Sequence, residues 1–424
     1  MKFIYKLLSL SLAIACLSGC SAANTEIASS SAATATVTPT TDSTEVPASN
    51  NVFTSAGDGL YVTTDSGIYE LQTVFPDSAN IFYTDANTKE RIFLCANPNC
   101  THADESCPSY IATPSAMFPP MLLRVGDQLL VVFTEATDSS NPHGMLMNMD
   151  GSNRRTVFEL ASNQYMQGGF CTSGNDLYFD LYEINDSGNV TYQLWYVSFE
   201  NGTSEKVMDL GSDSDHYSLC DGANNELCFN HVSSDGISYC MYNPQSKTIS
   251  DPFFVDSSVS GNSMIQDGYL FVLDEPASSV QRIRLSDKEQ ASASFTVKEG
   301  FGAPSMRYLF DGNLMITEAQ TTASDIPTDG SYGVCSYILD FGTRNCTEFT
   351  LQTPYNNRPV YVLTTIGDAC YVATDYKTYT PTSVSEDGTV STFDYVANIY
   401  AFITKQDYIN SNQNGYSMVK DAFE

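Results

Sequence analysis

Turns rich in glycine, asparagine and aspartate alternate with short apolar runs along most of the chain. Seven stretches begin with such a turn and continue as an apolar strand: Gly57–Val62, Gly126–Val131, Gly174–Phe179, Asn224–Phe229, Asp267–Val272, Asp311–Ile316 and Gly367–Val372. A tight turn of this composition commonly leads into a buried strand. The stretches are mostly about 43 to 56 residues apart, which is the period of a β-propeller blade. The pattern predicts an all-β fold, a β-propeller of seven four-stranded blades, with six or eight left open.

The third repeat shows the expected blade most clearly. Strand-like runs at Asp176–Tyr182, Tyr192–Phe199 and Ser204–Leu210 are separated by turn residues. Later repeats carry polar insertions at Thr321–Gly330 and Thr378–Thr392, and such insertions usually lie on one face, often the binding face. We expect the ring to close through a blade finished near the C-terminus, from strands at Ala397–Thr404 and Tyr416–Val419.

The first nineteen residues have the pattern of a secretion signal. Lys2 and Lys6 are followed by an apolar core from Leu7 to Leu17, and Cys20 stands directly after Ser18 and Gly19. The core is too short to span a bilayer, which predicts a cleaved segment. Leu-Ser-Gly-Cys resembles a bacterial lipobox. That resemblance implies a lipidated Cys20 as the mature N-terminus and a protein anchored on the extracytoplasmic face of the cell membrane.

Residues 20–50 contain the lipidated cysteine and a run of serine, threonine and alanine with almost no bulky apolar side chain. Such a segment buries too little surface to offset its ordering entropy, so we expect a disordered tether with a reach of roughly 30 Å. Residues 51–424 then form the propeller, with a Cys/His-rich insertion at 95–107.

The charge balance narrows the range of partners. Fifty acidic residues face nineteen basic ones, a net charge of −31. A surface of this sign repels phosphate backbones, so we predict no nucleic-acid partner. The charge is typical of a soluble cell-surface protein, and attraction of cations or basic peptides is the alternative.

Two short sequence motifs in the repeat resemble motifs of known propeller families. Phe82-Tyr83-Thr84-Asp85 resembles the Tyr-Trp-Thr-Asp signature of LDL-receptor-type propellers, and the stretch from Met149 to Val157 is similar to a turn of those proteins and of TolB-like propellers. The chain as a whole resembles propeller-containing lipoproteins of uncharacterised function from anaerobic Gram-positive gut bacteria.

The densest group of chemically reactive residues lies between the first two repeats. Cys95, Cys100, His102 and Cys107 occur within 13 residues. Three thiolates and an imidazole suit a tetrahedral Zn²⁺ site. A disulfide, Cys95–Cys107 or Cys100–Cys107, is the competing interpretation outside the cytoplasm, and redox or cofactor attachment is a third.

Cys335 and Cys346 flank a hairpin turn and are candidates for a second disulfide across it. We name no catalytic residue, because the chain has no Gly-x-Ser-x-Gly elbow, Walker loop, dinucleotide fingerprint or EF-hand loop.

The sequence therefore predicts a non-enzymatic, membrane-tethered propeller that binds a peptide, glycan or partner protein. The alternative is an extracytoplasmic hydrolase of carbohydrate or peptide that uses carboxylates at the propeller channel.

Overall fold

The structure is a computed structural model, and it describes residues 53–55, 59–74, 78–113, 119–137, 140–256, 262–321, 333–380, 382–384, 390–392 and 395–421. The predicted leader, Cys20 and the tether lie outside these residues, as do most of the two predicted insertions. The described part of the chain is almost entirely β-strand. Its helices are the short α1, Lys405–Ile409, and the 3₁₀ turn η2, Gln413–Gly415, and none of them could cross a membrane.

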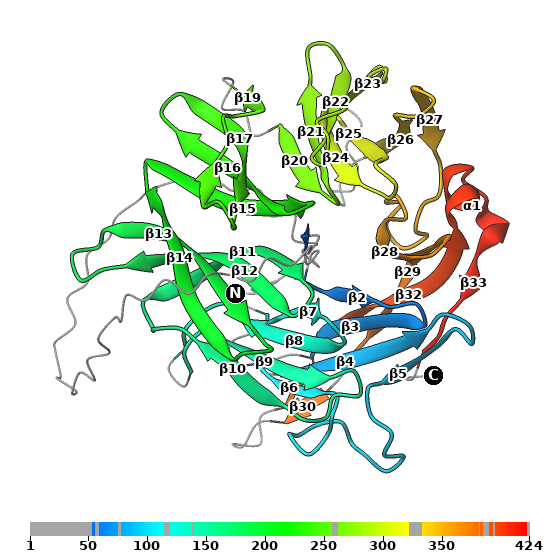
Figure 1. Ribbon diagram of the computed structural model, residues 1–424. Coiled ribbons are helices and arrows are strands. Elements are labelled where there is room, and N and C mark those ends of the chain that lie inside the picture. The colour runs from blue at the N-terminus through cyan, green and yellow to red at the C-terminus, as the bar shows by residue number, and fades with distance from the viewer. Residues whose placement is uncertain are drawn as a thin grey trace, which may run out of the picture. The chain divides into compact units, whose positions relative to one another are not determined.

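The strands form antiparallel sheets that follow one another along the chain (Figure 1). The first sheet has the order β2-β3-β4-β5-β34, with β6 also paired to β4, and the second has the order β10-β9-β8-β7. The bounds in the first sheet are β2 Tyr61–Thr63, β3 Gly67–Val74, β4 Ser78–Asp85, β5 Glu90–Phe93, β6 Tyr110–Ala112 and β34 Lys420–Asp421. Those in the second are β7 Met121–Val125, β8 Gln128–Phe133, β9 His143–Asn148 and β10 Arg155–Glu159.

A ten-stranded sheet follows, in which two four-stranded units are joined through a two-pair contact between β14 and β15. Its strands are β1 Thr54–Ser55, β11 Gln164–Ser173, β12 Asp176–Ile184, β13 Val190–Ser198, β14 Thr203–Ser212, β15 Asp215–Ala223, β16 Glu226–Ser233, β17 Gly236–Asn243, β18 Thr248–Ile249 and β19 Phe254–Asp256. The first unit is β11–β14, and the second is β15–β18.

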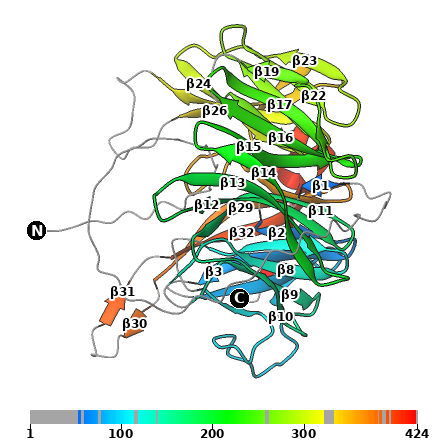
Figure 2. The same cartoon turned by 60° about the vertical axis from the view of Figure 1, so that its left-hand side comes forward.

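Three further four-stranded sheets complete the series. They are formed by β20 Ser263–Gln266, β21 Tyr269–Asp274, β22 Ser279–Arg284 and β23 Gln290–Ser294; by β24 Phe301–Tyr308, β25 Leu314–Gln320, β26 Val334–Asp340 and β27 Asn345–Phe349; and, in the last sheet, by β28 Val362–Ile366, β29 Ala369–Tyr379, β32 Tyr395–Thr404 and β33 Ser417–Met418. Between β29 and β32, β30 Thr382–Val384 and β31 Val390–Thr392 form a two-stranded ribbon that leaves the sheet (Figure 2).

Apolar clusters between consecutive four-stranded units hold the sheets together. Seven such clusters occur among the described residues, and each combines residues from two neighbouring units. One of them joins the last sheet to the first through Ile68, Tyr371, Tyr400 and Phe402. Each unit therefore has an apolar neighbour on both sides, and the units form a closed ring. The all-β class and the β-propeller fold predicted from the sequence are confirmed.

The predicted turn-and-strand units correspond to the second strand of every four-stranded unit except the first. Residues at these turns adopt the left-handed conformation that a two-residue hairpin loop requires, for example Gly126 (φ 54°), Asn224 (φ 55°) and Gly367 (φ 55°). The strands that follow are buried on both faces, as in β8, where Leu129 to Phe133 are all buried. Sheets covered on both faces read as continuous apolar runs rather than as alternating ones.

The first predicted unit is one strand out of phase with the others. Tyr61 to Thr63 form β2, which is the first strand of its sheet, whereas the second strand is β3 and begins at Gly67. Gly57 and Asp58 lie outside the described residues. The chain has two successive turn-and-strand patterns here, one ending in β2 and the other in β3. Only the sheet pairing shows that β3 is the strand equivalent to the second strand of the other units.

The ring closes through the C-terminal strands, as expected, and also through a pairing that was not predicted. The predicted strand at Ala397–Thr404 is part of β32, which pairs with β33, and β34 adds to the first sheet, parallel to β5. At the N-terminal end, β1 pairs with β11 (Thr54 opposite Thr172), and the Phe53 N–H donates to the Asn224 carbonyl (2.8 Å). The N-terminal strand is thus held by the ten-stranded sheet and does not complete the last sheet.

Candidate functional site: a cysteine–histidine loop and a cavity at the ring closure

The Cys/His loop is an excursion from the outer strand of the first sheet. β5 and β6 both pair with β4, one after the other along the same edge. Ile81 of β4 bonds both ends of the excursion, because its carbonyl accepts from the Leu94 N–H (2.9 Å) and its own N–H donates to the Ser109 carbonyl (2.8 Å). This pairing brings Cys95, just after β5, next to Cys107, just before β6.

Four potential ligand atoms converge within this loop. The sulfurs of Cys95, Cys100 and Cys107 and a ring nitrogen of His102 all lie within 4.8 Å of one another. The His102 Nδ1 is 3.2 Å from the Cys107 Sγ. Ligand atoms around a tetrahedral metal with bonds of 2.0 to 2.3 Å are about 3.3 to 3.8 Å apart. The spacing is compatible with a metal site, and the arrangement specifies no particular metal.

The loop backbone and its hydrogen bonds orient these groups. His102 has a left-handed backbone (φ 56°), which turns its ring back toward the cysteines, and its N–H donates to the Cys100 Sγ (3.4 Å). The ring stacks on Phe93 with 4.0 Å between centroids. Cys107 is buried and bonds the Ser109 hydroxyl (3.1 Å), which donates to Asn80 Oδ1 of β4 (2.9 Å). The site is therefore fixed to the first sheet.

The thiols differ in their readiness to ionise. Burial raises the pKa of Cys95 to about 11, and hydrogen bonding with the Cys107 and Cys100 sulfurs adds to the rise. Burial also opposes ionisation of Cys107, but hydrogen bonds from Ser109 and His102 outweigh it and lower the pKa to about 6. The thiolate is the form that binds metals, so Cys107 is the sulfur that the loop itself prepares for this role.

The far end of the loop is attached to the second sheet. The Arg154 guanidinium donates to the carbonyls of Tyr110 (2.6 Å), Pro108 and Gly151 (3.1 Å). A side chain added at Gly151 would lie 2.4 Å from the Pro108 carbonyl, so only glycine fits this contact. The loop thereby connects two neighbouring sheets, which is a structural arrangement and not a catalytic one.

Neither predicted disulfide is formed in the structure, where Cys95, Cys100 and Cys107 are all free. Cys335 and Cys346 are also unbonded, and the β26–β27 register does not support that prediction. Cys346 faces Leu339, four positions along β26 from Cys335. Four strand residues span about 13 Å, which exceeds the reach of a disulfide.

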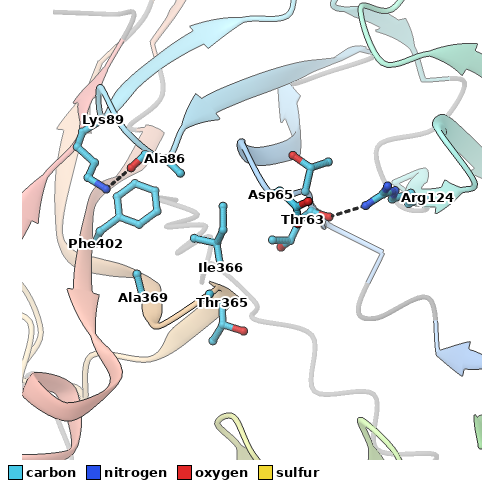
Figure 3. A pocket seen from close by; sticks show the side chains of 11 residues that line it. Thr63, Asp65, Ala86, Lys89, Arg124, Thr365, Ile366, Ala369 and Phe402 are labelled. Atoms are coloured by element: carbon cyan, nitrogen blue, oxygen red, sulfur yellow. Dashed lines mark hydrogen bonds between the residues drawn. The ribbon is translucent and has the colours of Figure 1, made fainter.

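A cavity of about 440 Å³ lies where the last sheet meets the first (Figure 3). The β2–β3 turn (Thr63 to Asp65) and the β28–β29 turn (Thr365 to Gly367) line it, together with Lys89, Arg124 and Phe402. The two sheets are bonded here by the hydroxyls of Thr63 and Thr364 (2.9 Å). Asp65 is the one carboxylate among the residues that line this cavity.

The residues of this cavity were not identified from the sequence. Lys89 and Arg124 come from different sheets and share no motif, so their one sequence signal is that basic residues are scarce. Ser109 had no sequence signal, because ordinary polar residues are common near turns. Arg154 lies within Met149–Val157, which was singled out for its resemblance to a propeller turn and not for a contact with the Cys/His loop.

No protein-family model matches the chain, and no curated protein matches it. Similar solved structures include a putative 6-phosphogluconolactonase from Bacteroides uniformis (11 % identity, TM-score 0.38, covering 84 % of this chain and 100 % of that one). Oligogalacturonate lyase from Vibrio parahaemolyticus (9 %, 0.38, 82 % and 91 %) and TolB from Acinetobacter baumannii (8 %, 0.34, 87 % and 79 %) are also similar. The chain covers 35 % of the length of tricorn protease, another similar structure. At these identities and TM-scores the likeness assigns no function to this chain.

Proposed function

We propose that this protein is a lipid-anchored, extracytoplasmic β-propeller of seven blades that binds a peptide, glycan or partner protein without catalysis. Support for the anchor is the Leu-Ser-Gly-Cys motif ending at Cys20, and support for the blade number is the sevenfold repeat together with the apolar clusters between consecutive units. The observation that carries the binding role is the cavity at the ring closure.

The composition of the cavity separates binding from the hydrolase alternative. Glycoside hydrolysis uses two carboxyl groups about 5 to 9.5 Å apart on either side of the scissile bond. Among the residues that line the cavity only Asp65 is acidic, and its neighbours are threonines and two basic side chains. Such a lining can hold a polar ligand through hydrogen bonds and charge, but it lacks the second carboxylate that would act on a glycosidic bond.

A binding screen tests the role of the cavity. We expect at least one soluble peptide or glycan in a panel to raise the melting temperature of the full-length protein in detergent. The shift should be lost in Thr365→Trp, which fills the cavity, and kept in Thr248→Trp, an exposed position on the edge strand β18. Turnover of a panel member, or binding that Thr365→Trp leaves intact, would contradict the proposal.

We also propose that Cys95, Cys100, His102 and Cys107 hold a structural Zn²⁺. Three sulfurs and one nitrogen complete a four-coordinate shell, the pattern of structural zinc sites, which leave no open position for a substrate. Elemental analysis of the purified protein should find about one zinc per chain. Cys107→Ser should lose the metal, whereas Cys346→Ser, an exposed cysteine outside the loop, should retain it. A bridged Cys95–Cys107 or Cys100–Cys107 peptide in mass spectrometry would instead establish a disulfide.

A further inference from the structure

We infer that the cavity at the ring closure takes a small ligand bearing a carboxylate group, which pairs with one of the two cations that line the cavity, Lys89 or Arg124. This inference deepens the proposed binding function and rests on it. The two cations come from separate parts of the ring: Lys89 precedes β5 of the first sheet, and Arg124 lies on β7 of the second. In a chain with fifty acidic and nineteen basic residues, this cavity is lined by two basic side chains and one acidic one, Asp65, so its lining is positive by one charge and favours an anion.

Lys89 is a partly desolvated cation without an ion-pair partner among the described residues. Its ammonium donates to the Ala86 carbonyl and lies 4.0 Å from the centre of the Phe402 ring. Burial lowers its pKa, and the nearby Asp85 offsets part of that effect. A charge that is partly withdrawn from water, and whose direct contacts among the described residues are a carbonyl and an aromatic face, gains from a bound carboxylate.

Arg124 is positioned by the backbone and keeps its charge available. Its guanidinium donates to the carbonyls of Gly126 (2.9 Å) and Thr63 (3.4 Å), which fix its direction. Among the described residues its one acidic contact is Asp127 at 3.4 Å, and the Asp127 side chain is 99 % exposed. Such a solvated pair contributes little, so a ligand carboxylate competes with it readily.

The surface between the two cations suits the rest of a polar ligand. Figure 3 shows Lys89 and Arg124 at opposite ends of the cavity, with Ile366 and Asp65 between them. The Thr365 hydroxyl and the Asp65 carboxylate are polar groups suited to ligand hydroxyl or amide groups, while Ile366 offers an apolar contact. This chemistry is shared by an acidic saccharide and an acidic peptide, which the experiment distinguishes.

Titration calorimetry of the full-length protein tests the inference with two matched pairs of probes: a glucuronic-acid disaccharide against its neutral glucose counterpart, and N-acetyl-glutamate amide against N-acetyl-glutamine amide. We expect one acidic probe to bind at least tenfold more tightly than its neutral counterpart. Raising the salt concentration should weaken that binding. The probe that binds identifies the source of the carboxylate.

Three variants and one control complete the test. Lys89→Met or Arg124→Gln, whichever removes the cation that pairs with the carboxylate, should weaken binding of the acidic probe at least tenfold, whereas Lys89→Arg keeps the charge and should retain binding at least in part. Unchanged binding in both Lys89→Met and Arg124→Gln would contradict the inference. Lys206→Met removes an equal charge from the exposed strand β14 and should have no effect. Equal binding of acidic and neutral probes, or no binding of either acidic probe, overturns the carboxylate assignment. The proposed binding function falls only if the panel screen above also fails.

Discussion

At the scale of single residues, buried acids connect neighbouring blades through backbone N–H groups. Asp180 of β12 accepts a hydrogen bond from the Leu219 N–H of β15 (3.0 Å). Asp221, also on β15, accepts from the Gly268 N–H at the turn before β21 (2.8 Å). Both side chains are almost fully buried. A carboxylate that leaves water for a few N–H groups is only partly compensated, which makes the Asp180 contact sensitive to pH.

Asp180 gives a prediction on pH and stability. Burial raises its pKa to about 7, well above the usual value, although the backbone N–H groups oppose the rise. The folded state therefore binds the proton more tightly than the unfolded state, and stability falls as the pH rises from about 4 to about 7. Three units of pKa correspond to about 4 kcal/mol at most.

We expect Asp180→Asn to lack this loss, so that its free energy of unfolding relative to wild type rises between pH 5 and pH 8. Urea unfolding at a series of pH values measures the difference. Asp235→Asn, at an exposed turn, should follow the wild-type curve. A constant offset between Asp180→Asn and wild type across this range would show that Asp180 does not titrate there.

At the scale of elements, the ring closure depends on a buried ion-pair network on β3, β5 and β34. The Arg91 guanidinium is 1 % exposed and contacts Glu70 (2.8 Å) and Asp421 (3.2 Å). Glu70 also accepts from the Tyr400 hydroxyl of the last sheet (2.5 Å). The two-residue strand β34 is thus held by a side-chain network as well as by its backbone pairing with β5.

Removing the shared cation should weaken the closure strongly. Arg91→Met leaves Glu70 buried without its partner, and a loss of about 3 to 5 kcal/mol in the free energy of unfolding is expected. The double variant Arg91→Met/Glu70→Gln should recover part of it, because the unpaired charge is gone. Chemical denaturation measures both changes.

The matched control is the exposed ion pair between Lys420 of β34 and Glu90 of β5 (3.8 Å). Lys420→Ala should change stability by less than about 1 kcal/mol. If Arg91→Met were as mild as this control, the closure would rest on the apolar cluster alone.

At the scale of the whole molecule, the proposed attachment to the membrane rests on the leader sequence and not on the fold. A diacylated Cys20 would hold the protein at the membrane, since two acyl chains give stable binding where one is marginal. The strongly acidic sequence has no polybasic segment that would add attraction to anionic lipids. Membrane association is therefore expected to depend on the lipid.

Cys20→Ser should release the protein from the membrane. We expect fatty-acid labelling to disappear and the chain to move from the membrane fraction to the soluble fraction. Cys16→Ser, within the apolar core of the leader, should leave both unchanged. Fatty-acid label or membrane retention in Cys20→Ser would contradict the proposed anchor.

The sequence alone determined the features that arise from local chemistry. Glycine and asparagine turns with positive φ, followed by apolar runs, identified the second strand of six units and with it the propeller, because turn geometry and two-sided burial both leave a pattern in neighbouring residues. The Cys95–Cys107 group was also visible, because its ligands are close together in the chain.

Only the tertiary structure decided which distant segments meet. The phase of the first unit, the pairing of β34 with β5 and the cavity between Lys89 and Arg124 all depend on contacts across the ring. The separation of Cys335 from Cys346 follows from the register of β26 and β27. Strand register and ring closure are set by the packing of whole sheets. The residues that pack across sheets do not recur at a fixed spacing in the sequence, so no local pattern predicts their contacts.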